Sequence, residues 1–142
     1  MLAYDARIST KDVDAVIRPR ETGLKLAEIV GQEMGLPEQW LNDQVKLFLA
    51  PREELRELPL DMKGLHVTSP VAGYLLCMKA LACRSALPGY EGDLEDLRFL
   101  IRNMEITSVA EIQKWIDRYY PDDVIPEPQQ STIEALIAEV WS

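Results

Sequence analysis

The 142-residue chain has no apolar run long enough to span a membrane. No hydrophobic stretch reaches the roughly 18 residues that a transmembrane helix requires. The first residues, Met1 to Arg7, include charged groups and contain no apolar signal-peptide core. We therefore expect a cytoplasmic protein that does not enter a membrane.

Basic residues are too few for nonspecific binding to nucleic acid. Lysine and arginine total 15 against 24 aspartate and glutamate residues, so the formal net charge is −9. Nonspecific binding to a polyanion needs a basic surface that releases counterions, and the sequence has no lysine- or arginine-rich stripe. Any nucleic-acid partner must therefore be held by a local group of residues.

Cysteine is also scarce, with only Cys77 and Cys83 in the chain. Both fall on a predicted helix, where a spacing of six residues directs their side chains about 120° apart. That divergence prevents a disulfide between them. We expect two buried, reduced thiols.

The residues that are present predict one folded domain over residues 1–142. Hydrophobic residues make up 47% of the chain, which argues against disorder, and the length suits a single domain with a real core. Helical patterns dominate. We expect an α+β fold in which a small mixed sheet, carrying an Asp-Val-Asp strand, packs against a mostly helical body.

Periodicity and capping signals place the elements of this fold. Strands are expected at 12–18 and 64–69, and helices at 21–34, after Pro37, at 71–83 and at 93–103. Capping boxes at Ser108–Glu111 and Ser131–Glu134 predict two further helices, after a linker over 121–130. Ser69 and Asp93 are expected to cap the helices that follow them, with Pro70 as a first helical residue.

The Asp-Val-Asp triplet is the first candidate site. On a strand, Asp12 and Asp14 project to the same side, and two carboxylates there can bind a hard divalent cation such as Mg²⁺. Such an ion with a phosphate favours phosphoryl or nucleotidyl transfer. The alternative is an acidic pair that is solvated or paired with arginine.

Lys79 is the only charge in the apolar stretch from Val71 to Cys83. Burying an ammonium without a partner costs several kcal/mol, so a nearby anion, a phosphate for example, is expected. Alternatively, the Lys79 stem packs on the helix and its head reaches solvent. Asp93 and Asp96 follow as a possible third part of the site, or as groups that only stabilise a helix N-terminus.

Three ordered segments carry a resemblance to a known family. They are the strand Ser9-Thr10-Lys11-Asp12-Val13-Asp14, the helix Tyr74-Leu75-Leu76-Cys77-Met78-Lys79, and the segment Gly92-Asp93-Leu94-Glu95-Asp96-Leu97. Together with Leu36–Asp43, they resemble the minimal nucleotidyltransferase-like proteins related to AbiEii-type toxins. The resemblance implies that Asp12 and Asp14 hold Mg²⁺ and the triphosphate, and that Lys79 and Asp96 complete the active cleft.

The sequence departs from this family in two places. Relatives have a glycine turn before the aspartate pair, whose backbone amides cradle phosphate, but no glycine precedes Asp12 here. Arg7, Ser9 and Thr10 are candidates to contact phosphate instead. Many relatives also carry a third carboxylate on a later strand, where this sequence offers His66, a residue that is usually structural when it stands alone.

Two hypotheses about function follow. In the first, the chain binds a Mg²⁺–nucleoside triphosphate and transfers a nucleotide to an RNA or protein acceptor, in the toxin–antitoxin or phage-defence setting that the resemblance implies. In the second, it is a degenerate, noncatalytic member of the fold that acts as a protein-interaction module. Apolar surface left uncovered beside the sheet would favour a homodimer.

Overall fold

In the computed structural model, residues 12–83 and 91–142 are described, and the chain divides into two compact units. The first unit ends at Leu49 and the second begins at Ala50. Helices and short strands occur in both, so the α+β class expected from the sequence is confirmed. The expectation of one domain over residues 1–142 stays a prediction.

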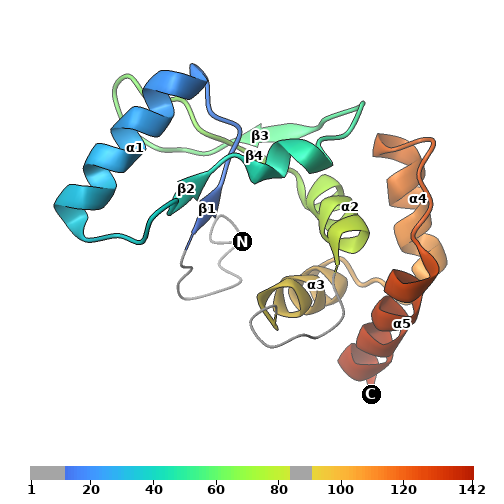
Figure 1. Cartoon of the computed structure of the whole chain (residues 1–142). Coiled ribbons are helices and arrows are strands. Elements are labelled where there is room, and N and C mark those ends of the chain that lie inside the picture. The colour runs from blue at the N-terminus through green and yellow to red at the C-terminus, as the bar shows by residue number, and fades with distance from the viewer. Residues whose placement is uncertain (1–11, 84–90) are drawn as a thin grey trace. The chain divides into compact units, whose positions relative to one another are not determined.

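The first unit is a strand–helix–strand arrangement (Figure 1). Strand β1 (Val13–Asp14) pairs in parallel with β2 (Leu41–Asn42), and helix α1 (Arg20–Met34) connects them. A short 3₁₀ helix, η2 (Gln44–Phe48), follows β2. Parallel strands need such a crossover connection, which a helix usually supplies.

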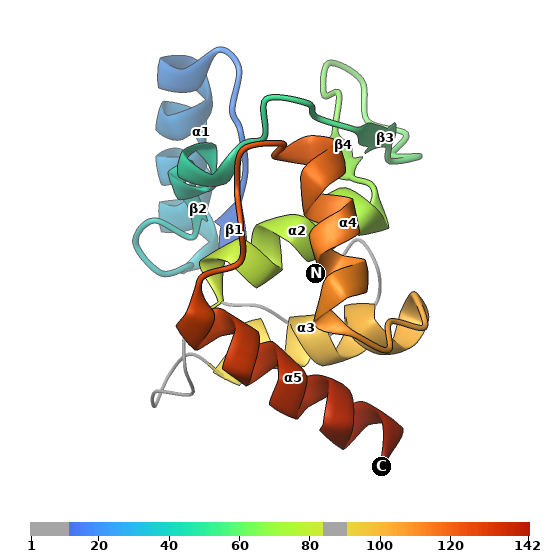
Figure 2. The same cartoon turned by 90° about the vertical axis from the view of Figure 1, so that its right-hand side faces the viewer.

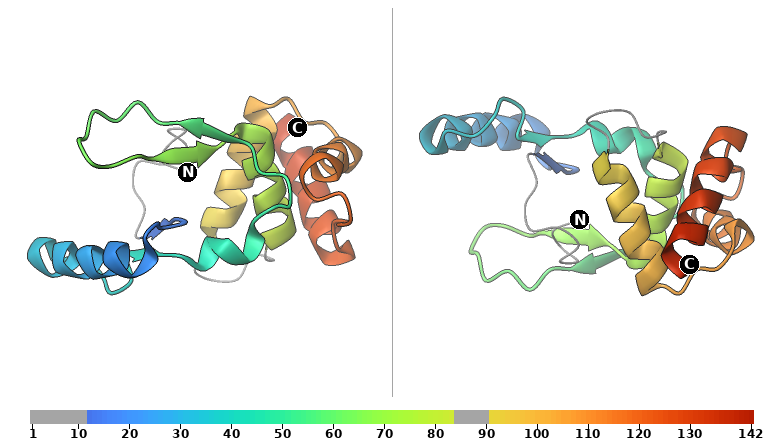
Figure 3. Two further views of the ribbon diagram at one scale, coloured as in Figure 1. Left: turned by 90° about the horizontal axis from the view of Figure 1, so that it is seen from above. Right: turned by 90° about the horizontal axis from the view of Figure 1, so that it is seen from below.

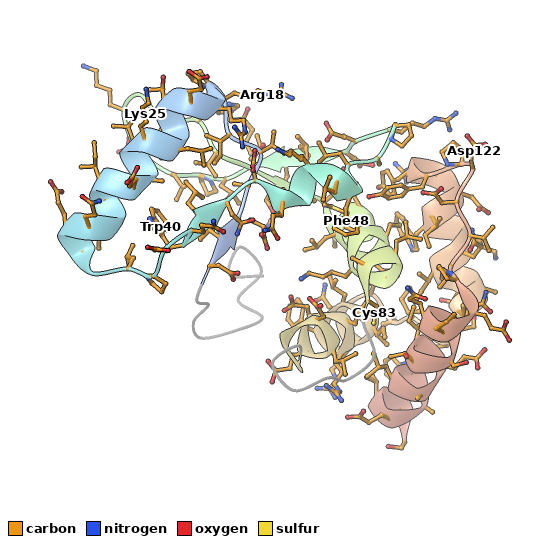
Figure 4. The ribbon with its side chains drawn as sticks, viewed as in Figure 1. Arg18, Lys25, Trp40, Phe48, Cys83 and Asp122 are labelled. Carbon is orange, nitrogen blue, oxygen red and sulfur yellow. The ribbon has the colours of Figure 1, made fainter. Side chains whose placement is uncertain are left out.

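Helix α1 is held to the strands by one aromatic side chain. The Trp40 indole Nε1 donates a hydrogen bond to the carbonyl of Ala27 at 2.8 Å, and Figure 4 shows Trp40 between α1 and β2. A Cβ on Gly31 would lie 3.0 Å from the Trp40 ring, so the glycine permits this close approach. Gly35 ends α1 in the left-handed conformation with φ 65°, as the sequence predicts.

Two expectations for the first unit are wrong in extent or type. The expected strand at 12–18 is paired only over Val13–Asp14, because its partner β2 is equally short. The helix expected after Pro37 is absent from this described stretch, where β2 and η2 stand instead. The carbonyl of Trp40 accepts a hydrogen bond from the Val13 backbone N–H, so strand pairing takes precedence over local helical spacing.

The second unit combines a hairpin with four helices (Figure 2). Strands β3 (Leu55–Glu57) and β4 (Thr68–Pro70) pair antiparallel, with Arg56 opposite Ser69. Figure 3 shows that the hairpin loop between them extends away from the helices of this unit. The helices are α2 (Ala72–Ala82), α3 (Glu91–Asn103), α4 (Val109–Tyr119) and α5 (Glu127–Trp141).

Helix α2 lies in the interior of this unit, as its uniformly apolar sequence predicts. Helices α3 and α4 pack directly against it, and α5 packs mainly against α3. The two thiols are free and buried, as expected, and burial raises the pKa of Cys77 to about 12. Fully buried side chains come from all four helices: Leu76, Cys77, Leu97, Leu100, Ile112, Ile116 and Ile133.

One of the predicted helix caps is confirmed. Ser108 precedes α4, and its side-chain oxygen accepts a hydrogen bond from the Glu111 backbone N–H, as in a capping box. The other box is wrong, because α5 already begins at Glu127 and Ser131 lies inside it.

The caps proposed at Ser69 and Asp93 are also wrong. Ser69 and Pro70 belong to β4, and α2 starts only at Ala72. Asp93 lies within the first turn of α3, which starts at Glu91. In place of the single mixed sheet expected, the described residues form two separate two-stranded sheets. Among these residues, no helix is both long and apolar enough to cross a membrane.

Candidate functional site

Asp14 stands at the carboxyl end of β1, directly across the parallel ladder from Asn42 in β2. Two backbone hydrogen bonds fix this register, from Val13 N to the Trp40 carbonyl at 2.6 Å and from Ala15 N to the Asn42 carbonyl at 2.9 Å. In α/β arrangements, ligands bind outside the carboxyl ends of parallel strands. The register thus places a carboxylate and a carboxamide together at such an edge.

Asp12 and Asp14 are both exposed. Asp14 lies in β1 and Asp12 directly precedes it, so the same-side placement expected from their two-residue spacing stays a prediction. Carboxylate oxygens are ligands that Mg²⁺ accepts, and Mg²⁺ usually keeps several waters or phosphate oxygens as its other ligands. Within the described residues, no group of three or more His, Cys, Asp or Glu side chains could hold a metal. A metal bound by this pair would therefore need ligands from solvent or substrate.

Asn42 and Asp43 also lie at this edge, although no local sequence pattern marks them as site residues. The Asn42 Oδ1 accepts a hydrogen bond from the Gln44 backbone N–H at 3.1 Å, which orients its side chain. Asp43 accepts from Arg20 Nε at 2.5 Å and from Lys46 Nζ at 3.0 Å. These hydrogen bonds lower the pKa of Asp43 to about 2. The spacing of Trp40, Leu41, Val45 and Phe48 is typical of a helix, so it did not predict the strand that positions both residues.

Lys79 and Asp96 come together in the second unit. The Lys79 Nζ lies 2.8 Å from Asp96 Oδ2 and 3.5 Å from Asp93 Oδ1. The Asp96 side chain is 0% exposed and that of Lys79 is 23% exposed. The anion expected beside Lys79 is therefore present, as two carboxylates on α3.

His66 is not on a strand. It precedes β4 in an exposed part of the hairpin, where its Nε2 lies 2.8 Å from Glu57 Oε1. His66 therefore forms an exposed pair with Glu57, as expected for a structural residue. The other proposed phosphate contacts, Arg7, Ser9 and Thr10, lie outside the described residues.

The candidate residues fall into two groups. Asp12 and Asp14 belong to the first unit, and Lys79 and Asp96 belong to the second. The convergence of the two groups on one substrate, which the sequence resemblance implies, stays a prediction.

Comparison with known proteins gives no further guide to function: no family model matches the chain, and no significant match was found among curated proteins or solved structures.

Proposed function

We propose that the chain is a nucleotidyltransferase-like protein that binds a Mg²⁺–nucleoside triphosphate and transfers its nucleotide to an RNA or protein acceptor. The observation that carries this proposal is the position of Asp14 opposite Asn42 at the carboxyl edge of β1 and β2. The exposed Asp12, directly before β1, adds a second carboxylate two residues from Asp14.

The donor set at this edge is compatible with Mg²⁺. Asp12 and Asp14 offer hard carboxylate oxygens, and both are accessible to solvent. Two protein carboxylates are a usual contribution to a Mg²⁺ site, because triphosphate oxygens and water supply the rest. When bound, the ion would neutralise charge on the phosphates.

In the proposed reaction, an acceptor hydroxyl attacks the α-phosphorus in line and pyrophosphate leaves. The acceptor hydroxyl loses its proton, for which a carboxylate of the aspartate pair is the proposed acceptor. Lys79 is assigned a phosphate contact by the resemblance. Because Asp96 is fully buried and holds the Lys79 ammonium, we assign it the role of positioning Lys79.

A thermal-shift experiment on the full chain tests the proposal. We expect Mg²⁺ plus one of the four nucleoside triphosphates to raise the melting temperature, since a ligand that binds only the folded state stabilises it. Asp12→Asn or Asp14→Asn should abolish the rise. Asp61→Asn, which changes the same charge at an exposed residue of the hairpin, is the matched control and should keep it.

A second candidate function, a noncatalytic interaction module, is favoured by one observation. Helix α1 exposes large apolar side chains, with Leu26 at 56%, Ile29 at 52% and Met34 at 69%. Exposed apolar clusters often mark protein-interaction surfaces. Absence of a thermal shift with all four nucleotides would support this candidate and contradict the transferase.

A further inference from the structure

Two cations converge on one carboxylate oxygen beside the strand edge. Arg20 Nε lies 2.5 Å and Lys46 Nζ 3.0 Å from the same Oδ2 atom of Asp43. Asp43 directly follows β2, and Arg20 is the first residue of α1. The cluster of Arg20, Asp43 and Lys46 therefore belongs to the same unit as Asp14.

This cluster carries more positive than negative charge. Two cationic side chains share one carboxylate, which leaves an excess of one positive charge. Arg18 adds another cation close in sequence to Arg20, and Figure 4 shows it at the N-terminal end of α1. Glu21, in the first turn of α1, reduces the local positive charge. The cluster is a local basic group in a chain whose net charge is −9.

Several donors of the cluster are directed at no protein acceptor within the described residues. The Arg20 side chain uses its Nε–H toward Asp43, and a guanidinium has further N–H groups on its two terminal nitrogens. The Lys46 ammonium uses one of its three N–H donors toward the same residue. Both side chains are about half exposed, at 56% and 50%.

Asp43 fixes the orientation of the arginine. A carboxylate that binds the Nε–H holds the guanidinium plane and leaves its terminal nitrogens available for an anion. Arginine in this state binds phosphate through two parallel hydrogen bonds, whereas lysine acts as a point charge. A phosphate group fits this pair of cations better than a single carboxylate, because it offers oxygens in several directions.

We infer that Arg20 and Lys46 bind the phosphate chain of the nucleoside triphosphate, with Asp43 as the residue that positions them. This inference rests on the proposed function. Arg20 and Lys46 are then binding residues and Asp43 is a positioning residue.

Inorganic tripolyphosphate in the presence of EDTA is the probe that separates this inference from the proposed function. Calorimetric titration of the full chain should detect binding without metal. The double variant Arg20→Gln, Lys46→Gln should weaken it at least about tenfold. Asp12→Asn with Asp14→Asn should not weaken it, because no metal is present for these carboxylates to hold and they carry no positive charge toward the phosphate. The double variant Arg102→Gln, Lys114→Gln removes the same charge at exposed positions of the second unit and should also leave it unchanged.

Asp43→Asn provides the test of positioning. If Asp43 orients Arg20, this variant should bind tripolyphosphate more weakly even though it removes a negative charge. A general electrostatic attraction would instead make Asp43→Asn bind more tightly, which would overturn the positioning role.

Two further outcomes would overturn the inference. One is equal binding of tripolyphosphate by the wild-type chain and the Arg20→Gln, Lys46→Gln variant, or no binding by either. The other is binding of a short single-stranded RNA, but not of tripolyphosphate, that depends on Arg20 and Lys46. Metal-free binding that depends on Arg20 and Lys46, without any response to Mg²⁺–nucleotide, would support the phosphate site and contradict only the transferase.

Discussion

The Lys79 ammonium lies 2.8 Å from a carboxylate oxygen of Asp96 whose side chain is 0% exposed. This ion pair joins α2 to α3 and explains how an apolar interior helix keeps one lysine. A buried charge is tolerated only when it is paired and hydrogen-bonded, and Asp93 at 3.5 Å adds a second carboxylate. Lys79 and Asp96 therefore have a structural role in addition to any part in catalysis.

The first prediction concerns this pair. Lys79→Met should lower the free energy of unfolding by about 3–5 kcal/mol, because it removes the ammonium from the fully buried Asp96 carboxylate. Asp96→Asn should cost less, because Lys79 is partly exposed and keeps Asp93 at 3.5 Å. The double variant Lys79→Met, Asp96→Asn should cost less than the two single changes added together. Urea unfolding of the four proteins measures the coupling.

The exposed ion pair between Arg98 and Glu139 is the control for this prediction. Its Arg98 Nε–Glu139 Oε1 distance is 2.9 Å, and both side chains are well exposed to solvent. Arg98→Met should therefore change the unfolding free energy by no more than about 1 kcal/mol. Equal effects of Arg98→Met and Lys79→Met would contradict the importance of the buried pair.

The second prediction concerns the contact between α2 and α4. A Cβ on Gly73 would lie 2.5 Å from two ring carbons of Trp115. Gly73→Ala should destabilise the protein by about 1–3 kcal/mol through overpacking. Adding Trp115→Leu should recover part of this loss, which thermal unfolding of the single and double variants can measure. No recovery would show that the cost does not come from the ring.

The third prediction compares two serines, each of which begins a capping-box motif in the sequence. Ser108→Ala removes a side-chain oxygen that caps the Glu111 N–H and should cost about 1 kcal/mol. Ser131→Ala should change stability by less than about 0.5 kcal/mol, because Ser131 is an exposed residue inside α5. Chemical denaturation of both variants measures the two changes in the free energy of unfolding. A larger effect at Ser131 would contradict the observed start of α5.

The fourth prediction is a pH dependence at Asp43. Hydrogen bonds from Arg20 and Lys46 lower its pKa from 3.8 to about 2. A depressed carboxyl pKa contributes stability that is present above the unfolded-state value and is lost as the pH falls. The stability difference between the wild-type chain and Asp43→Asn should therefore shrink as the pH falls from about 3.8 to about 2, as measured by thermal unfolding. A difference that stays constant over this range would contradict the effect.

The sequence predicted elements whose signals are local. The helix over residues 21–34 and its end at Gly35 are confirmed, because a left-handed glycine is a strong local stop. The interior helix around Lys79 and the Ser108 capping box are confirmed for the same reason. Each of these features depends on residues within a few positions of one another.

The sequence did not predict features that depend on distant partners. Strand β2 exists because the Trp40 carbonyl and the Asn42 carbonyl accept hydrogen bonds from Val13 and Ala15, far away in the chain. Its helical spacing alone could not show this pairing. The cluster of Arg20, Asp43 and Lys46 depends on the same strand and was missed with it.

Prolines explain two of the misplaced helix starts. The composition of residues 121–130 predicts a linker, but α5 begins at Glu127, between Pro126 and Pro128. Proline in the first turn is a common signal for a helix start. Pro70 suggested a helix start, but it ends strand β4, opposite Leu55. Pairing with β3 decided its role, and local sequence does not reveal that pairing.

Paramagnetic broadening by Mn²⁺ in amide NMR spectra of the full chain tests the central claim most directly. In the presence of a nucleoside triphosphate, Mn²⁺ in place of Mg²⁺ should broaden the amide signals of Val13, Asp14, Ala15 and Asn42. The effect should disappear in the Asp12→Asn, Asp14→Asn variant. Unchanged signals at these four residues, with broadening confined to the acidic segment at Asp122 and Asp123, would contradict a nucleotide–metal site at the carboxyl edge of β1 and β2.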